Sequence, residues 1–166
     1  MELSKELLES LFEYKDGGLY WKQCKGFRNR HIGQKAGYIA TRADGYKCWV
    51  IRIKDKQLLE HRIIFMLHHG YMPKEIDHVD NNSLNNKIEN LREASTTENQ
   101  QNSTVRTDNT SGIKGVSWDR RNKKWKVQAK VNGKLKYFGS YVDIELADLV
   151  AQEARNKHHG VFARHK

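Results

Sequence analysis

The chain has 166 residues, of which 37% are hydrophobic and 30% are charged, and its formal net charge is +10. This length can hold one domain or two or three small ones, and the low hydrophobic content argues against a single large core. No apolar run approaches the roughly 18 residues of a membrane span, and the first ten residues lack the apolar block of a signal peptide. We therefore expect a soluble, cytoplasmic protein without a membrane partner.

The charge is unevenly distributed along the chain. Residues 15–56 hold eleven basic and three acidic side chains, a net charge of +8, and residues 112–166 hold thirteen and five, again +8. The stretches 1–14 and 57–111 each carry −3. This pattern is typical of a protein whose outer parts bind a polyanion while its centre collects a cation. A basic surface alone fits DNA, RNA or simple solubility equally well.

The two cysteines, Cys24 and Cys48, are far apart and form no CxxC pair. They cannot build a zinc ribbon in the usual way, and a disulfide is not expected in a reducing compartment. We interpret both as free thiols.

The N-terminal third predicts one helix followed by a small antiparallel sheet. Apolar residues recur at helical spacing over residues 4–14, and Ser4 is suited to cap that helix. Strands are predicted at 18–22, 36–41 and 46–53, the last two joined by a turn that contains Asp-Gly.

The polar stretch 23–34 between these strands is predicted to be an exposed loop. The basic side chains in or beside this loop are Lys22, Lys25, Arg28 and Arg30. They could contact phosphate or could simply be solvated, and the sequence does not favour either interpretation.

A second helix is predicted over residues 60–69. Its centre is strongly apolar, Gly70 is suited to end it, and Pro73 prevents its continuation. His61 near its start is interpreted as a buried histidine that supports the site and does not bind metal.

The centre of the chain, residues 76–102, predicts a strand, a polar loop, a second strand and a helix. Apolar runs at 76–79 and 88–91 flank the loop, whose asparagines Asn81, Asn82, Asn85 and Asn86 we interpret as turn residues. Ser95, with Glu98 three residues on, is a capping-box signature that places Asn99 in the first turns of the helix.

This central stretch contains one carboxylate, one imidazole and two amides at positions suited to chemistry: Asp77, His78, Asn90 and Asn99. The oxygens of Asp77 and Asn99 are hard donors of the kind that Mg²⁺ or Mn²⁺ prefers. His78 lies beside Asp77 on the same strand, and imidazole, with an ordinary pKa of about 6.5, can accept a proton from water at neutral pH.

Four residues at matching spacings closely resemble the HNH endonucleases: Asp77, His78, Asn90 twelve residues after the histidine, and Asn99 nine further on. The resemblance implies a ββα-metal fold that holds one divalent cation and hydrolyses a DNA phosphodiester bond. It implies that His78 is the general base, that Asp77 and Asn99 hold the metal, and that Asn90 braces the hairpin and orients the histidine.

The last part of the chain predicts three strands and one helix behind a linker at 103–111. The strands are expected at 115–120, 124–131 and 134–138, with an Asn-Gly turn between the last two. In the middle strand apolar residues, including Trp125, alternate with polar ones, so one face is apolar and the other basic. The helix at 144–156, rich in alanine, is suited to cover the apolar face.

Residues 112–165 resemble the AP2 DNA-binding domain, through GVSW, the NGK turn, FGSY and the helix with spaced alanines. That resemblance implies a three-stranded sheet that enters the major groove of DNA. Carried over by position, the implied contacts are Lys114, Trp118, Arg120, Arg121, Lys126, Gln128, Lys130 and Tyr137.

The sequence as a whole predicts an α+β protein that hydrolyses double-stranded DNA. We expect a basic N-terminal part at 1–56, an HNH motif at 57–102, the linker at 103–111 and an AP2-like domain at 112–166, in an endonuclease of phage or homing type. One site cuts one strand, so nicking, double-strand cleavage and the oligomeric state stay open. The alternatives are a DNA-binding regulator with a retained HNH scaffold and an RNA-binding protein.

Overall fold

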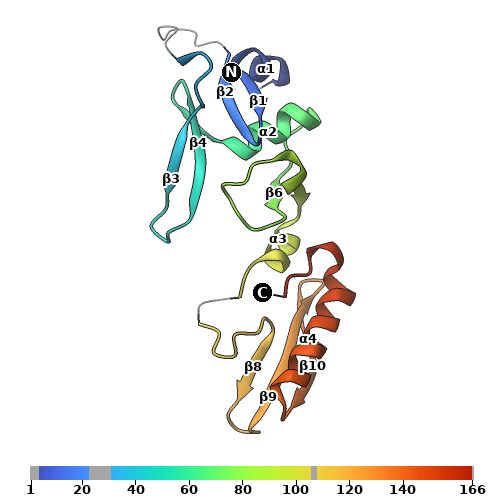
Figure 1. Ribbon diagram of the computed structural model, residues 1–166. Coiled ribbons are helices and arrows are strands. Elements are labelled where there is room, and N and C mark those ends of the chain that lie inside the picture. Colours follow the sequence, from blue (N-terminus) through green and yellow to red (C-terminus); the bar gives the residue numbers. More distant parts are fainter. Residues whose placement is uncertain (1–3, 23–30, 106–107, 166) are drawn as a thin grey trace. The chain divides into compact units, whose positions relative to one another are not determined.

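The computed structural model describes residues 4–22, 31–105 and 108–165. Its chain forms two compact units, Met1–Glu93 and Ala94–Lys166, with the mixed α+β composition that was predicted (Figure 1). Each unit is described by itself. The predicted free thiol of Cys24 and the basic side chains of Lys25, Arg28 and Arg30 lie outside the described residues.

The first unit begins with helix α1 (Lys5–Leu11), followed at once by a β-hairpin. Ser4 caps the helix as predicted, because its side chain accepts a bond from the Leu7 N–H. The helix is shorter than expected: its predicted last turn is instead strand β1 (Phe12–Lys15), which pairs with β2 (Gly18–Trp21).

A three-stranded antiparallel sheet follows, with β4 (Lys47–Ile53) between β3 (Tyr38–Thr41) and β5 (Lys56–Leu59). The turn that joins β3 to β4 was predicted, whereas β5 was not. Cys48 on β4 is a buried free thiol, as expected.

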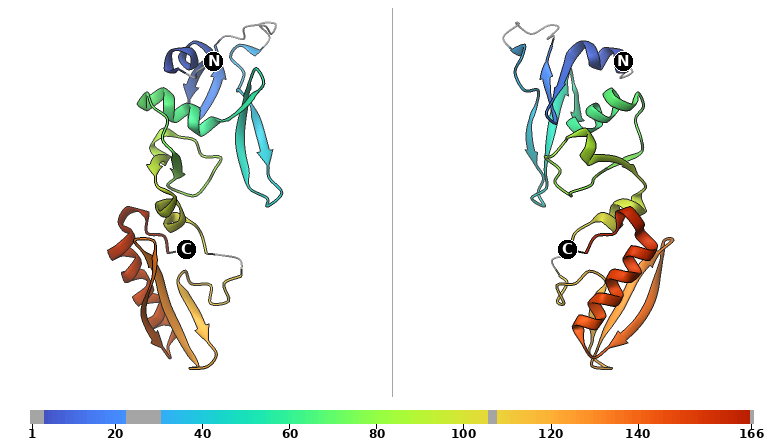
Figure 2. Two further views of the ribbon diagram at one scale, coloured as in Figure 1. Left: turned by 180° about the vertical axis from the view of Figure 1, so that it is seen from behind. Right: turned by 45° about the vertical axis from the view of Figure 1, so that its right-hand side comes forward.

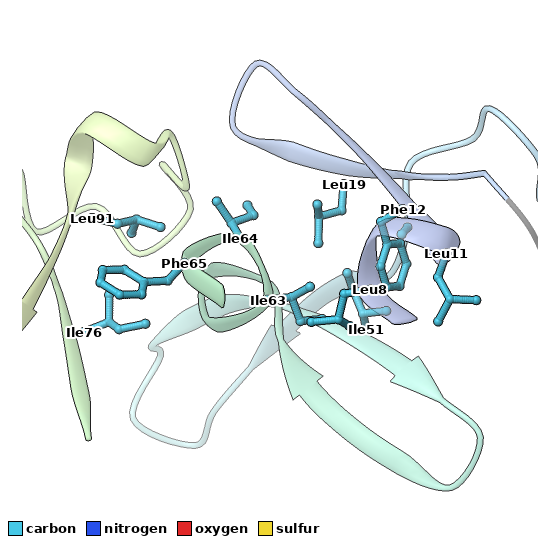
Figure 3. Packing of buried hydrophobic residues seen from close by; sticks show 11 residues of the cluster. Leu8, Leu11, Phe12, Leu19, Ile51, Ile63, Ile64, Phe65, Ile76 and Leu91 are labelled. Carbon is cyan, nitrogen blue, oxygen red and sulfur yellow. The ribbon is translucent and has the colours of Figure 1, made fainter. Parts of the chain in front are cut away.

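Helix α2 (Glu60–His69) runs through the middle of the first unit. It has the predicted bounds and ends at Gly70, whose φ of 79° is the left-handed conformation that glycine adopts most readily. Its apolar side chains join the core, where Figure 3 shows them between the N-terminal elements and the strands that follow; among them are Ile63, Ile64 and Phe65.

The strands β6 (Glu75–His78) and β7 (Leu91–Ala94) pair in a small sheet after α2. The predicted second strand at 88–91 was wrong in position, because Ile88–Asn90 forms a 3-10 turn (η2) and the strand starts only at Leu91. The turn directs the buried Asn90 side chain inward, a constraint that the apolar pattern does not reveal.

The second unit holds α3 (Thr96–Asn102), three antiparallel strands and the long helix α4 (Ile144–His159), which ends in a 3-10 turn, η3 (Gly160–Phe162). The strands are β8 (Val116–Asp119), β9 (Lys124–Val131) and β10 (Lys134–Tyr141), in the order β10-β9-β8. Asn132 and Gly133 both have positive φ, as the predicted tight turn requires. β10 is three residues longer than predicted, because a bulge near Tyr137 and Gly139 lets pairing resume.

Helix α4 lies along one face of this sheet (Figure 2). The core between them contains Val116 and Val127 from the sheet and Ala147 and Ala151 from the helix. Trp125, predicted to be a core residue, is partly buried and packs against this cluster. Among the described residues, no helix is long and apolar enough to cross a membrane.

Candidate active site and nucleic-acid surface

Strand β6 carries two of the predicted site residues, Asp77 and His78. Side chains alternate between the faces of a strand, so Ile76 and His78 share the face toward α2 and Asp77 points to the other face. Ile76 packs near Phe65 of α2 in the core (Figure 3). Asp77 and His78 are 6% and 8% exposed, so partners in the protein determine their orientation.

The carboxylate of Asp77 is held by Arg92 on the neighbouring strand β7. The guanidinium Nε and one terminal nitrogen donate to Asp77 Oδ2 at 2.8 and 2.7 Å. Such charge-assisted bonds are stronger than neutral ones, and both are made to the same oxygen of the carboxylate. We did not predict Arg92; the available signal was an acidic and a basic side chain on two short strands flanking one loop.

His78 is held by a chain of buried hydrogen bonds that begins at the backbone of β2. The Leu19 N–H donates to Glu60 Oε1 at 2.9 Å, and the Asn86 side-chain amide donates to Glu60 Oε2 at 2.8 Å. The other end of that amide, Asn86 Oδ1, lies 2.9 Å from His78 Nε2. Glu60 and Asn86 are 0% and 1% exposed, so water does not compete for these bonds.

The interpretation of Asn86 as a turn residue was therefore wrong. An asparagine in a polar loop favours a turn on local grounds, but this one points inward and joins α2 to the histidine. Glu60, which we did not single out, had a signal: a charged residue directly before the apolar run of a helix.

His61 packs beside His78, as expected of a buried supporting histidine. The two rings meet edge to face with their centroids 5.0 Å apart. Burial, together with the neighbouring His78 and Arg62, lowers the pKa of His61 to about 3, so His61 is neutral at physiological pH. Burial also raises the pKa of Glu60, although the bonds from Leu19 and Asn86 oppose that shift.

Asn90 braces the loop between β6 and β7. Its Oδ1 accepts from the Asp80 N–H at 3.0 Å, and its Nδ2 donates to Asp80 Oδ1 at 2.9 Å and to the Asn85 carbonyl at 2.8 Å. The Asn90 carbonyl also accepts from the Val79 N–H. Of these two asparagines, Asn86 and not Asn90 makes the side-chain hydrogen bond to the His78 ring.

Asn99 lies on α3, in the second unit. Ser95 and Glu98 form the predicted capping box, in which Ser95 Oγ accepts from the Glu98 N–H and Glu98 Oε2 accepts from the Ser95 N–H. The Asn99 N–H donates to the Ser95 carbonyl at 3.0 Å, which places Asn99 just after the first turn. The sequence thus correctly predicted how this helix starts and where Asn99 stands on it.

Comparison with known proteins shows which family these residues belong to. The family described as HNH endonuclease matches residues 59–101, which include all the site residues above except Leu19. Protein 3.8 of Escherichia phage T7 is 39% identical over 99 residues, covering 57% of this chain and 79% of that protein. The chain therefore belongs to the same family as Protein 3.8 and carries an HNH endonuclease domain. No solved structure gave a significant match.

In the second unit, the sheet presents a polar face away from α4. Directly paired strand residues share a face, so the register places Lys126 with Ser117 and Ser140, and Gln128 with Tyr137. Lys130 pairs with Leu135 on this same face. We call this surface the outer face; it consists of Ser117, Lys126, Gln128, Lys130, Leu135, Tyr137 and Ser140.

Four of the predicted DNA contacts lie on the outer face, and two lie beside it. Lys126, Gln128, Lys130 and Tyr137 belong to it by register. The other two, Arg120 and Arg121, are exposed in the turn between β8 and β9. The Asp119 carboxylate holds that turn by accepting from backbone N–H groups within it.

Trp118 and Lys114 are positioned differently from these six. Trp118 pairs with Trp125 on the side that α4 covers, with ring centroids 4.8 Å apart, although 42% of its surface is exposed. Lys114 Nζ donates to the carbonyls of Gln101 at 2.6 Å and Ser103 at 2.5 Å, at the C-terminal end of α3. Burial, with Arg155 and Arg164 nearby, lowers the pKa of Lys114 to about 8.

Proposed function

We propose that this protein is a metal-dependent hydrolase that cuts phosphodiester bonds in double-stranded DNA, with its target bound by the sheet of the second unit. The observation that carries the proposal is the buried setting of His78 at the end of β6, inside an HNH domain and next to Asp77. A histidine held by a dedicated hydrogen-bond chain has a defined orientation, which a general base requires.

In the proposed reaction His78 accepts a proton from the attacking water. The bond between its Nε2 and Asn86 fixes the ring, and the loop braced by Asn90 keeps Asn86 in place. Arg92 fixes the Asp77 carboxylate on the other face of β6. Proton transfer to a positioned base contributes about 10² to 10⁴ in rate.

The donor set suits a hard divalent cation such as Mg²⁺ or Mn²⁺. Asp77 and Asn99 offer one carboxylate and one amide oxygen, which leaves most coordination positions to water and phosphate. When bound, the cation supplies charge stabilisation for the phosphate undergoing hydrolysis.

The second unit is proposed to act as an AP2-like reader over residues 112–166. Its outer face combines two lysines with one glutamine. Lys126 and Lys130 are suited to bind phosphate or guanine, and Gln128 is suited to bind adenine. The exposed Arg120 and Arg121 extend this basic surface at one end of the sheet. We propose the whole chain as a phage-type nuclease whose reader selects the site and whose HNH domain cuts it.

The decisive experiment incubates the purified protein with a library of supercoiled plasmids that carry random inserts, with and without Mg²⁺. We expect open-circle product that requires the metal, and a loss of about 10² to 10⁴ in rate for His78→Ala. The matched control is His68→Ala, which removes an exposed histidine of α2 in the same unit. That variant should cleave like the wild type.

Cleavage that persists unchanged in His78→Ala contradicts the assignment of the base. Sequence-specific binding of duplex DNA without any metal-dependent cleavage would instead favour the DNA-binding regulator. Preference for RNA over duplex DNA in a competition filter assay would favour the RNA-binding alternative.

A further inference from the structure

We propose that Glu60 and Asn86 are positioning residues that determine which ring nitrogen of His78 carries the proton. They hold the neutral imidazole as the tautomer protonated on Nε2, so that the lone pair lies on Nδ1. The catalytic meaning of this inference rests on the proposed function of His78, but the tautomer itself can be measured without cleavage.

The argument starts from a hydrogen-bond donor that cannot be reversed. The Leu19 N–H belongs to the backbone, and it donates to Glu60 Oε1 at 2.9 Å. The bond from Leu19 favours the ionised form of Glu60 and opposes the effect of burial, and an ionised carboxylate accepts bonds at both oxygens and donates none. Its second oxygen, Glu60 Oε2, therefore accepts from whatever group faces it, which is the side chain of Asn86 at 2.8 Å.

The amide of Asn86 transmits this polarity to the histidine. Because its NH₂ group faces Glu60, its carbonyl oxygen Oδ1 faces His78 Nε2 at 2.9 Å. An amide oxygen only accepts, so Nε2 must carry the hydrogen. A neutral imidazole has a single N–H, and the lone pair is therefore on Nδ1.

Burial keeps the chain of bonds from rearranging. Glu60 and Asn86 are almost fully enclosed, and reversing the amide would place its oxygen against a carboxylate oxygen. The neutral ring of His61, edge to face with His78 at 5.0 Å between centroids, restricts rotation of the imidazole. Thus three elements, β2, α2 and the loop after β6, jointly set the tautomer of one side chain.

Glu60→Gln tests this inference because it has almost the same shape and the opposite polarity. In this variant the new amide must turn its oxygen to the fixed Leu19 N–H, so its NH₂ group faces Asn86. Asn86 then turns over and presents its own NH₂ to His78. Nε2 becomes the acceptor, and the proton moves to Nδ1.

The measurement is nitrogen-15 NMR of the histidine rings in the metal-free protein at a mildly alkaline pH of about 8.5. Two-bond couplings to the ring carbon-bound protons distinguish a protonated nitrogen from an unprotonated one. His78→Gln assigns the signal. The wild type should show the proton on Nε2, and Glu60→Gln should show it on Nδ1.

The matched control is Glu89→Gln, the same substitution at an exposed residue outside the site, which should leave the tautomer of His78 unchanged. If the proposed function holds, plasmid cleavage by Glu60→Gln should fall about 10² to 10⁴-fold, the usual contribution of a general base. DNA affinity should not change.

A wild-type His78 protonated on Nδ1 overturns the inference, even if the variant fails to fold. So does a folded Glu60→Gln protein in which the proton stays on Nε2. The predicted switch of tautomer in a protein that never cleaves DNA overturns the proposed function but leaves the hydrogen-bond chain established.

Discussion

The side-chain oxygen of Asn86 lies 2.9 Å from Nε2 of His78, across a loop that begins with Asp80. This bond makes the loop part of the site, because the residues that shape the loop also place the amide that holds the histidine. The loop therefore connects two strands and also positions His78. The contribution of the loop to the free energy of unfolding can be measured without measuring DNA cleavage.

Asn90→Ala should destabilise the first unit by about 2–3 kcal/mol. The substitution leaves the Asp80 N–H and the Asn85 carbonyl, whose bonds to Asn90 are part-buried, without their partner, and an unsatisfied buried group costs about 1–3 kcal/mol. Urea unfolding monitored by circular dichroism gives the free energy. Asn82→Ala is the control: Asn82 is exposed, and the bond that its side chain accepts from the Leu84 N–H is local and exposed, so the loss should be about 1 kcal/mol or less. Equal losses in the two variants would contradict the bracing role of Asn90.

The stability of the first unit should fall as the pH drops below 6.5, because of His61. The pKa of His61 is lowered from 6.5 to about 3 by burial, so the unfolded chain accepts a proton in this range while the folded chain does not. Acidification therefore favours unfolding. Between pH 7 and pH 4.5 this one group should contribute a loss of about 2–3 kcal/mol.

His61→Phe, which keeps a ring and removes the titration, isolates the contribution of His61. The free energy of unfolding is measured at both pH values for the two proteins. The wild type should lose more stability than the variant on acidification. Parallel losses would show that His61 does not titrate as described.

Lys126 and Lys136 offer a matched test of the nucleic-acid surface, because both are lysines but lie on opposite faces of the sheet. Lys126 belongs to the outer face, whereas Lys136 pairs with Ala129 on the other side. Lys126→Ala should weaken duplex binding and lower the slope of log affinity against log salt by about 1, the expected effect of losing one phosphate contact. Lys136→Ala should change neither. Fluorescence anisotropy across a salt series decides, and equal effects would mean that the outer face is not the bound face.

Lys114→Met should loosen α3 within the second unit without altering the sheet. The ammonium group bonds the carbonyls of Gln101 and Ser103, and a bond to a charged donor contributes about 1.5–3 kcal/mol. Hydrogen exchange of the α3 amides should become faster by about tenfold or more. The exposed Lys134→Met serves as the control. Unchanged exchange in α3 would show that the Lys114 bonds do not hold the helix.

Local sequence patterns were enough to predict several features of the fold. It predicted α2 and its end at Gly70, the capping box at Ser95, the turn at Asn132 and the alternation along β9, because each depends on neighbouring residues and backbone geometry. The spacing of Asp77, His78, Asn90 and Asn99 likewise pointed to an HNH domain, which the comparison found.

The partners of these side chains became known from the folded arrangement of the chain. Asn86 was predicted to lie in a turn, and its burial between Glu60 and His78 depends on an α2 residue twenty-six positions away. The hydrogen-bond partners of Arg92 and Lys114 likewise depend on packing. Arg92 donates to Asp77, and Lys114 donates to a carbonyl at the end of α3. The physical reason is that burial withdraws water from a polar group, so its partner is whichever complementary group the fold brings within about 3 Å. Local sequence patterns carry little information about that partner.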